Sequence, residues 1–337
     1  NAYARSGSVM VGTHNFKGKL YDTTVDTSDI ANMRSNNVVV NATTVGTNSW
    51  NNAAFGVVNG AYSAITGAYD GGGFRPNSAQ NFGATITGSL NSIESKTASS
   101  NYSGIANSIV GVANRTFNSN GSLIYGAGNE ITNSVEDIYS APTSGGNSPE
   151  ALAQNLRRVI KESNGGGSTM AFGGGNRADY TLRTAMIGVN NTVTGTSRRP
   201  STYNSITGFK NAATNVNHVS VIGSENEIEN TDDALVLGNK RKLAGANGSV
   251  ILGSGNSVIT TSVENAVSIG HNANVQKAGG VALGSGSVAS VDKGVAGYDP
   301  STKATSTDTS STWKATEAAV SVGDASKGIT RQITGVA

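Results

Sequence analysis

The stretch Val219-Ser220-Val221-Ile222-Gly223-Ser224-Glu225-Asn226-Glu227-Ile228 decides the fold, because its pattern repeats along the chain. Apolar and small residues lead to a glycine, an asparagine follows three residues later, and an apolar residue comes two residues after that. The pattern returns around Gly238 and Gly253, which follow Gly223 at intervals of 15 residues. A fixed period of this size predicts a repeat architecture in which each repeat contacts its neighbours.

The glycine of this pattern can be followed through most of the sequence. Its positions are Gly12, Gly46, Gly56, Gly88, Gly111, Gly126, Gly173, Gly188, Gly208, Gly223, Gly238, Gly253, Gly270 and Gly284. Asparagine follows three residues later at Asn15, Asn59, Asn91, Asn114, Asn129, Asn176, Asn191, Asn211, Asn226 and Asn256. An apolar residue follows five residues later at Ile93, Ile131, Val193, Ile228, Leu243, Val258 and Val275.

Each repeat holds two short segments rich in Val and Ile, which favours strands over helices. Gly and Asn tolerate a positive φ angle, so we interpret each Gly-x-x-Asn as a corner between two strands. Coils of this kind stack at about 4.8 Å and pair their backbones with the coils above and below. A single coil cannot bury its apolar face, so only the stack is stable. The sequence therefore predicts an all-β protein with a parallel β-roll over residues 1–290.

Composition excludes several classes of function. Charged residues make up 14% of the chain and the net charge is +2, so we expect no nucleic-acid partner. Cysteine is absent, which excludes disulfides and thiolate metal sites. Asp26-x-Ser28-Asp29 lacks the spacing and the glycine of a calcium-binding EF-hand loop. No motif for a metal, a cofactor or a catalytic group is found, and no apolar run reaches the ~18 residues of a membrane span.

Two segments depart from the period and are the candidates for ligand binding. The first is a loop insert at about 68–82, in which Tyr69, Phe74 and Arg75 stand together, because aromatic residues and Arg are enriched at binding hot spots. Its three glycines are not followed by the Lys-Ser/Thr of a phosphate-binding loop. The second is an insert at about 134–168 with an amphipathic helix over Pro149–Glu162. Ser148 is the predicted N-cap of this helix, and its apolar stripe is expected to pack on the roll or on a neighbouring subunit.

The period also fails near the C-terminus, over residues 291–318. One more coil-like strand follows in the segment 319–337, which ends with Ile329, Ile333 and Val336 at the spacing of a coiled-coil seam. Because this seam begins just before the last residue, we expect the chain to be a piece of a longer protein.

Several of these motifs resemble the YadA-like head family, the trimeric autotransporter adhesins of Gram-negative bacteria. Asn265-Ala266-Val267-Ser268-Ile269-Gly270 and Gly280-Val281-Ala282-Leu283-Gly284 resemble the head repeat of that family. Ala319-Val320-Ser321-Val322-Gly323, followed by Arg331-Gln332-Ile333, resembles its neck. Gly297-Tyr298-Asp299-Pro300, Trp313 and Ala319-Val320 resemble the head-insert motif that precedes the neck. The resemblance is specific from about residue 184 to residue 337 and looser before that.

The resemblance implies a left-handed β-roll, a homotrimer, and a neck at 319–337 that leads into a coiled-coil stalk. It also implies a location on the bacterial cell surface, held in the outer membrane by a C-terminal anchor that this sequence does not include. The implied activity is adhesion, without catalysis, to host cells, matrix proteins or other bacteria.

Two other functions remain as alternatives. The first is self-association, in a biofilm or as a structural fibre. The second is a left-handed β-helix acyltransferase with a catalytic histidine, for which His14, His218 and His271 would be the candidates. Acyltransferases of that class require an apolar residue at every sixth position, which a glycine-marked period of 15 does not provide.

Overall fold

The computed structural model of the chain describes residues 9–13, 42–51, 53, 55–66, 81–95, 103–136, 138, 148–164 and 168–335. The chain forms two compact units, Asn1–Pro200 and Ser201–Ala337, a division that the sequence did not predict. Both units are built from the same coil. All strand pairs within the two rolls are parallel, as the repeat predicts.

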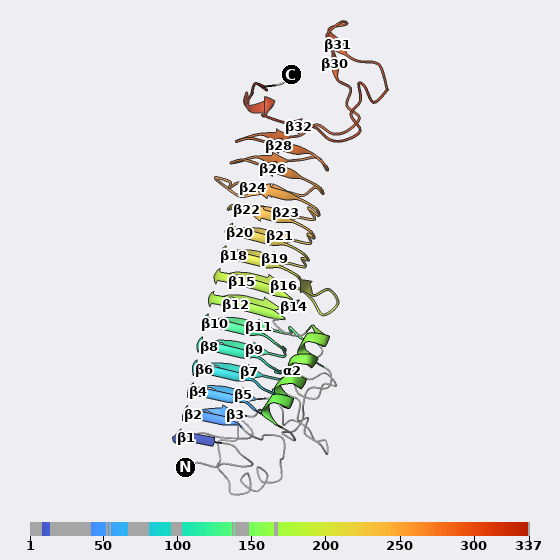
Figure 1. Cartoon of the computed structure of the whole chain (residues 1–337). Coiled ribbons are helices and arrows are strands. Elements are labelled where there is room, and N and C mark those ends of the chain that lie inside the picture. Colours follow the sequence, from blue (N-terminus) through green and yellow to red (C-terminus); the bar gives the residue numbers. More distant parts are fainter. Residues whose placement is uncertain are drawn as a thin grey trace. The chain divides into compact units, whose positions relative to one another are not determined.

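In the first unit, two sheets follow the stack of coils (Figure 1). Sheet A of this unit contains β1 (Val9–Thr13), β2 (Thr43–Thr47), β4 (Val57–Ala61), β6 (Thr85–Ser89), β8 (Ser108–Val112), β10 (Leu123–Ala127), β12 (Thr169–Gly174) and β15 (Thr184–Val189). Sheet B contains β3 (Trp50–Asn51), β5 (Ala64–Thr66), β7 (Ser92–Glu94), β9 (Arg115–Phe117), β11 (Glu130–Thr132), β13 (Arg177–Asp179) and β16 (Thr192–Thr194). A further short strand, β14 (Thr181–Leu182), belongs to neither sheet.

The second unit repeats this arrangement. Its sheet A contains β18 (Ser205–Phe209), β20 (Ser220–Ser224), β22 (Leu235–Leu237), β24 (Val250–Leu252), β26 (Val267–Ile269), β28 (Val281–Leu283) and β32 (Val320–Ser321). Its sheet B contains β19 (Ala212–Thr214), β21 (Glu227–Glu229), β23 (Arg241–Ala244) and β25 (Ile259–Thr261), and a separate pair is formed by β27 (Asn274–Val275) and β29 (Val288–Ala289). The short strand β17 (Ser201–Thr202) precedes β18.

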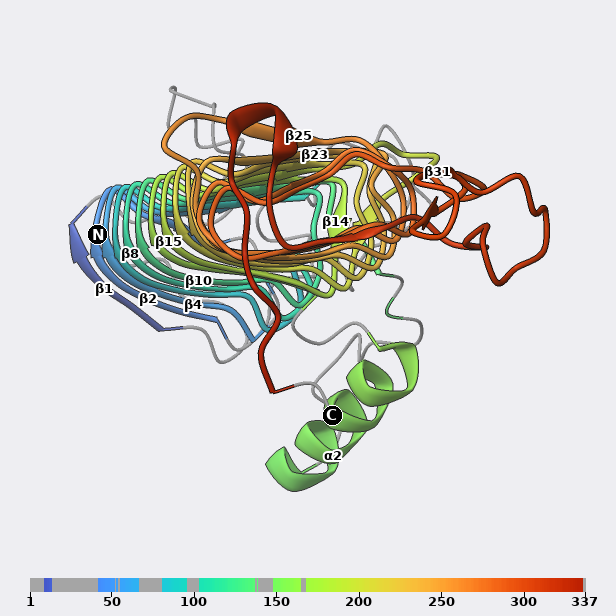
Figure 2. The ribbon, with the colours of Figure 1, turned by 90° about the horizontal axis from the view of Figure 1, so that it is seen from above.

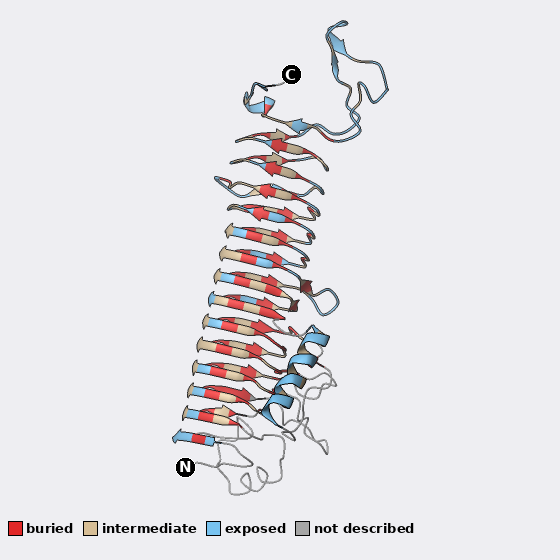
Figure 3. Cartoon of the chain, viewed as in Figure 1, coloured by how far each residue is buried: buried red, intermediate tan, exposed pale blue. Residues whose placement is uncertain are grey.

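The core of each roll lies between its two sheets, because alternate side chains of every strand point inward. Figure 3 shows the buried residues as a band along each stack of strands. In the first unit, Ile109 and Ile124 of sheet A and Ile131 and Val193 of sheet B are fully buried. Each such side chain contributes about 1.5–3 kcal/mol through burial. Stability therefore grows with every coil that is added to the stack.

The glycine of the repeat is required by close contact between coils. Gly126 adopts a φ angle of +141°, and a Cβ atom placed on it would lie 1.8 Å from the carbonyl oxygen of Gly173 in the next coil. No other residue fits this position. One assignment from the sequence was wrong, because Gly60, and not Gly56, pairs with Gly46 in sheet A. Gly56 precedes β4 instead, and Asn59 points outward from that strand.

The asparagine of the repeat forms a buried ladder along the first unit. The Nδ2 atom of Asn114 donates to Oδ1 of Asn91 at 3.0 Å and to the carbonyl oxygen of Gly126 at 2.7 Å. Oδ1 of Asn114 in turn accepts from the backbone and side chain of Asn129, each at 3.0 Å. Each amide therefore ties a coil to the coils before and after it, which explains why the repeat needs Asn rather than another polar residue.

One coil of the second unit is longer than the sequence pattern assumed. Gly253 and Gly270 are 17 residues apart, and the additional residues widen the corner between β24 and β25. Thr261, and not Val258, therefore pairs with the inward-facing Leu243 in sheet B. Val258 is 59% exposed, and Asn256 is exposed as well. The assignment of Asn256 and Val258 to the repeat was therefore wrong.

Helix α2 (Pro149–Ser163) forms where the sequence predicted it. Ser148 is its N-cap and accepts a hydrogen bond from the Ala151 backbone. Viewed from above, the helix stands outside the coils of the first unit (Figure 2). Its Val159 packs into an apolar cluster with Phe82, Ile105 and Ile138. The apolar stripe therefore packs on the side of the roll, which was one of the two positions expected.

The C-terminal part of the second unit contains an excursion and a clasp. The excursion carries a small antiparallel pair, β30 (Tyr298–Asp299) and β31 (Ala304–Thr305), and the clasp contains the 3₁₀ turn η1 (Ala325–Lys327). Arg331 reaches back to the last coil, where it donates to the Ser287 hydroxyl at 3.0 Å and to the Ser285 carbonyl at 2.6 Å.

The residues of the expected coiled-coil seam are not helical in this chain. Ile329 instead exchanges two backbone hydrogen bonds of 2.9 Å with Asp324, and the described residues after it form no helix. The coiled coil thus stays a prediction. Among the described residues, no helix is long and apolar enough to cross a membrane.

Candidate binding surfaces

The predicted loop site lies outside the part of the chain that the structure describes. Tyr69, Phe74 and Arg75 all fall in residues 67–80, between β5 and β6. The structure therefore neither brings these side chains together nor separates them. The second predicted candidate, helix α2, presents Arg157, Arg158 and Lys161 on its exposed side. Arg158 is already paired with Glu162 at 2.7 Å, so this face is not a free basic patch.

The outer face of sheet A is apolar in both units. The residue just before each repeat glycine points away from the core, and it is most often a large apolar side chain. In the first unit Tyr125 is 59% exposed and Ile187 is 49% exposed. In the second unit the exposed members are Ile222, Leu237, Ile269 and Leu283. A continuous row of apolar side chains on a protein surface is typical of an interface with another protein.

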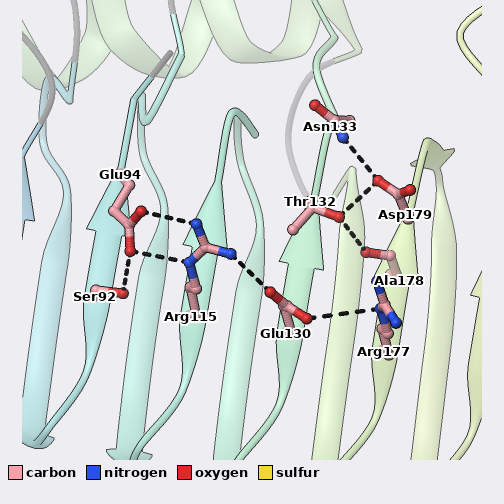
Figure 4. A network of polar contacts seen from close by, with 9 residues as sticks. All are labelled: Ser92, Glu94, Arg115, Glu130, Thr132, Asn133, Arg177, Ala178 and Asp179. Atoms are coloured by element: carbon pink, nitrogen blue, oxygen red, sulfur yellow. Dashed lines mark hydrogen bonds and ion pairs between the residues drawn. The ribbon is translucent and has the colours of Figure 1, made fainter. Parts of the chain in front are cut away.

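The outer face of sheet B in the first unit carries a row of alternating charges, which we call the ionic row (Figure 4). It consists of Glu94, Arg115, Glu130 and Arg177, from four successive coils. Arg115 donates to Glu94 at 2.9 Å and to Glu130 at 2.8 Å. Arg177 lies 3.7 Å from Glu130 and keeps 62% of its side chain exposed. The parallel register of the strands places these residues next to one another, as in Arg115 beside Glu130.

Hydrogen bonds hold the ionic row in its charged form. Burial raises the pKa of the Glu94 carboxyl, but hydrogen bonds from Arg115 and Ser92 outweigh this effect and bring the pKa below its usual value. The bond to Glu94 also raises the pKa of the Arg115 guanidinium. Both groups therefore stay ionised throughout the physiological pH range, and Arg115 is further placed over the Phe117 ring at 5.2 Å.

A corner of the second unit exposes an aromatic stack. The rings of Tyr203 and His218, from adjacent coils, are parallel within 2° with their centroids 4.8 Å apart. The next coil places Oδ1 of Asp233 at 3.6 Å from Nδ1 of His218. All three residues have positive φ angles between 54° and 59°, a conformation that the corner imposes and that Gly248 adopts in the coil after Asp233.

The segment Lys240-Arg241-Lys242 appears in the sequence as a basic cluster, but the fold separates its side chains. Lys242 pairs with Glu227 at 2.8 Å on the outer face of sheet B. Arg241 is fully buried and continues the asparagine ladder, because its backbone donates to Oδ1 of Asn226 at 3.0 Å. Its guanidinium donates to the carbonyls of Gly253, Gly270 and Ala273 at 2.6, 3.1 and 2.7 Å. Burial lowers the pKa of this guanidinium.

The described histidines have no catalytic setting. His218 is stacked on Tyr203, and His271 is exposed and shares a hydrogen bond of 3.0 Å with Asn256. Within the described ranges, no group of three or more His, Asp or Glu side chains could hold a metal ion. The surfaces found here can dock another molecule, and we find no arrangement that could activate a nucleophile.

The sequence reasoning missed the ionic row, although a signal for it exists. Arg115, Glu130 and Arg177 each follow directly after a ladder asparagine, in Asn114-Arg115, Asn129-Glu130 and Asn176-Arg177. Aligning the coils on their asparagines would have placed three alternating charges in one column. The buried role of Arg241 had a similar signal, because it stands three residues after Gly238, where the repeat has Asn.

No protein-family model matches the chain. A stretch of 57 residues, 17% of the chain, is 56% identical to the autotransporter adhesin BadA of Bartonella henselae. This match spans about 2% of the length of BadA. The similarity supports a relationship with autotransporter adhesins, and it favours a non-enzymatic protein at the cell surface.

Proposed function

We propose that this chain is part of the head of a trimeric autotransporter adhesin of a Gram-negative bacterium. In this proposal it is exposed on the cell surface, connected to the outer membrane by a C-terminal anchor, and binds host cells, matrix proteins or other bacteria without catalysis. The similarity to the adhesin BadA supports the family. The parallel roll, the excursion that carries β30 and β31, and the clasp at Arg331 fit a YadA-like head with a left-handed roll, a head insert at 291–318 and a neck at 319–337.

The observation that carries this proposal is the apolar outer face of sheet A. A monomer would leave side chains such as Tyr125, Ile187 and Ile222 in water along the whole roll. Three copies that turn this face toward a common axis would bury it, since burial of apolar area is the main favourable term in association. Sheet B would then face outward and remain open to ligands. The neck would bring the three chains together into a coiled coil.

The trimer predicts a mass three times the 34.1 kDa of one chain in light scattering or equilibrium sedimentation. Replacing Ile187 with aspartate would place a charge in each copy of the interface, and we expect the trimer to dissociate at least tenfold more readily, which corresponds to about 1.4 kcal/mol. The matched control is Thr192→Asp on the outer face of sheet B, which should leave the mass unchanged. A monomeric wild-type chain with the same β-sheet circular dichroism would contradict the trimer.

For the ligand, we propose the loop insert at about 68–82 as the first contact site, with Tyr69, Phe74 and Arg75 as the side chains that bind. Helix α2 is the second candidate, since the roll does not need either insert to complete its coils. The test is the binding of labelled chain to matrix proteins, epithelial cells and other bacteria. We expect saturable binding to one of these partners, and its loss when residues 69–76 are replaced by a short linker. Binding that survives this replacement would move the site elsewhere.

The acyltransferase alternative finds no support in the site. His218 and His271 are engaged by Tyr203 and Asn256 on the surface of the roll. The glycine column repeats once per coil, rather than the six-residue apolar repeat that left-handed acyltransferases require. Stabilisation of the chain against heat by acetyl-coenzyme A would reopen this reading.

A further inference from the structure

We propose that the ionic row is a docking surface for a second copy of the same chain, bound in the antiparallel orientation. The row is formed by Glu94, Arg115, Glu130 and Arg177 on the outer face of sheet B in the first unit. This inference concerns a contact between chains of different assemblies, and it is separate from the trimer contact proposed for sheet A. Only its meaning for contacts between cells rests on the proposed surface location.

The order of the charges selects the partner. Along the roll the row reads negative, positive, negative, positive. A second copy with its axis reversed presents the opposite sign at every position, so that Glu94 faces Arg177 and Arg115 faces Glu130. A parallel copy in the same register would oppose like charges at every position. The row is therefore self-complementary only for an antiparallel partner, as an isologous two-fold contact requires.

The side chains are placed so that they act as one row. The Glu94 carboxylate leans toward Arg115, held by the Arg115 guanidinium at 2.9 Å and by the Ser92 hydroxyl at 2.8 Å. Asp179 leans the other way, since its Oδ1 accepts from the Thr132 hydroxyl at 2.6 Å and from Asn133 at 2.8 Å. It therefore does not add a fifth charge to the row. Thr192, in the next coil, ends the row with an uncharged residue.

The row keeps the capacity to bind outward. Arg177 is 62% exposed and its only ion pair within the row is long, at 3.7 Å. Arg115 is 41% exposed and Glu130 33% exposed. A carboxylate accepts up to about four hydrogen bonds and a guanidinium donates five, so the internal pairs leave donors and acceptors for a partner. The internal pairs also fix the side chains beforehand, which lowers the entropy lost on docking.

One such contact is weak, because exposed ion pairs contribute little and are screened by salt. Many copies on two opposing surfaces would add their contributions through multivalency. Antiparallel docking also suits two surfaces that face each other, since chains attached at the same end approach with opposite directions. The proposed partner is accordingly a chain on a second surface, and not a further subunit of the same assembly.

The test uses a variant in which every charge of the row is inverted, with Glu94→Arg, Arg115→Glu, Glu130→Arg and Arg177→Glu. The inverted row keeps its internal alternation and its net charge. It is self-complementary for an antiparallel copy of itself, but it opposes like charges in an antiparallel contact with wild type. The full chain is attached by its C-terminus to beads of two colours, and mixed-colour aggregates are counted at low and high salt.

We expect wild-type beads to aggregate with wild-type beads, and inverted beads with inverted beads, while mixed pairs form about tenfold fewer aggregates. All aggregation should disappear near 1 M salt, where the screening length is about 3 Å. Equal aggregation in the mixed pairs would overturn the proposal, as would a wild type that stays dispersed at low salt. Aggregation confined to the mixed pairs would establish a parallel contact and so also overturn it.

Two further variants keep the result interpretable. The neutral variant, with Glu94→Gln, Arg115→Met, Glu130→Gln and Arg177→Met, should aggregate with neither form and serves if the inverted chain does not fold. The control variant exchanges the exposed pair of helix α2, with Arg158→Glu and Glu162→Arg, and should behave as wild type. Binding to host or matrix partners is measured in parallel, so that loss of adhesion and loss of self-docking are distinguished.

Discussion

Replacing Gly126 with alanine is expected to lower the free energy of unfolding by at least about 4 kcal/mol, an effect that few single substitutions reach. The added methyl group would lie 1.8 Å from the carbonyl oxygen of Gly173, and this neighbour is backbone that cannot rotate away. The φ angle of +141° adds conformational strain for any L-residue. Strands β10 and β12 would therefore have to separate, and the ladder bond from Asn129 to Gly173 would be lost with them.

The control for this substitution lies two residues further along the same coil. Gly128 also has a positive φ angle, +66°, but a Cβ atom placed on it would meet nothing closer than the Gly175 nitrogen at 4.0 Å. Gly128→Ala should therefore cost only about 1 kcal/mol, the usual penalty of a left-handed conformation. Urea unfolding followed by circular dichroism measures both variants. Equal losses would mean that backbone strain, and not contact between the coils, explains the glycine column.

Replacing Arg241 with methionine is expected to cost about 2–4 kcal/mol. The change leaves three buried carbonyls, those of Gly253, Gly270 and Ala273, without their donor, at about 1–3 kcal/mol each. Part of this loss is offset, because methionine avoids the cost of burying an uncompensated charge. Thermal and urea unfolding should therefore show a clear net loss of stability in the second unit.

Two companions of this variant separate the causes. Arg241→Asn restores the usual ladder residue and can satisfy the Gly253 carbonyl only, so its stability should lie between the wild type and Arg241→Met. Lys242→Met removes the adjacent half-exposed ion pair with Glu227 and should cost no more than about 1 kcal/mol. A gain in stability for Arg241→Met would show that the buried charge costs more than its hydrogen bonds return.

The coil itself could be predicted from the sequence, because its two most constrained positions allow one residue type each. The close contact between coils admits only Gly, and the ladder needs a side chain with both a donor and an acceptor, which is Asn. Helix α2 was also predictable, since Ser148 and Pro149 mark its start and Leu156 and Val159 its apolar stripe. Features that follow from one coil, or from one helix, are thus readable without a structure.

Errors arose where a local pattern resembled the repeat at the wrong register. Gly56 with Asn59 imitates the motif, but the coil between Gly46 and Gly60 has 14 residues, so the true glycine comes four residues later. Asn256 and Val258 fail because the coil after Gly253 is longer. The β-pairing of neighbouring coils sets the register in both cases, and no single segment of sequence contains that information.

The binding surfaces were the least predictable part. The ionic row depends on side chains from coils that are 15 to 47 residues apart in sequence, such as Arg115, Glu130 and Arg177. Only the stacking makes them neighbours. The loop with Tyr69, Phe74 and Arg75 stays a prediction, because it lies outside the described residues.

The ladder also bears on how proteins of this kind change length during evolution. Deleting one whole coil, residues 112–126, would join Gly111 to Ala127 and leave Asn129 three residues after the glycine, so the ladder would close again. Most coils are therefore interchangeable units that duplication or deletion can add or remove. Arg241 is the exception, because it binds carbonyls of two later coils, at Gly253 and Gly270. Those coils must be inherited together, as a block whose length recombination cannot freely change.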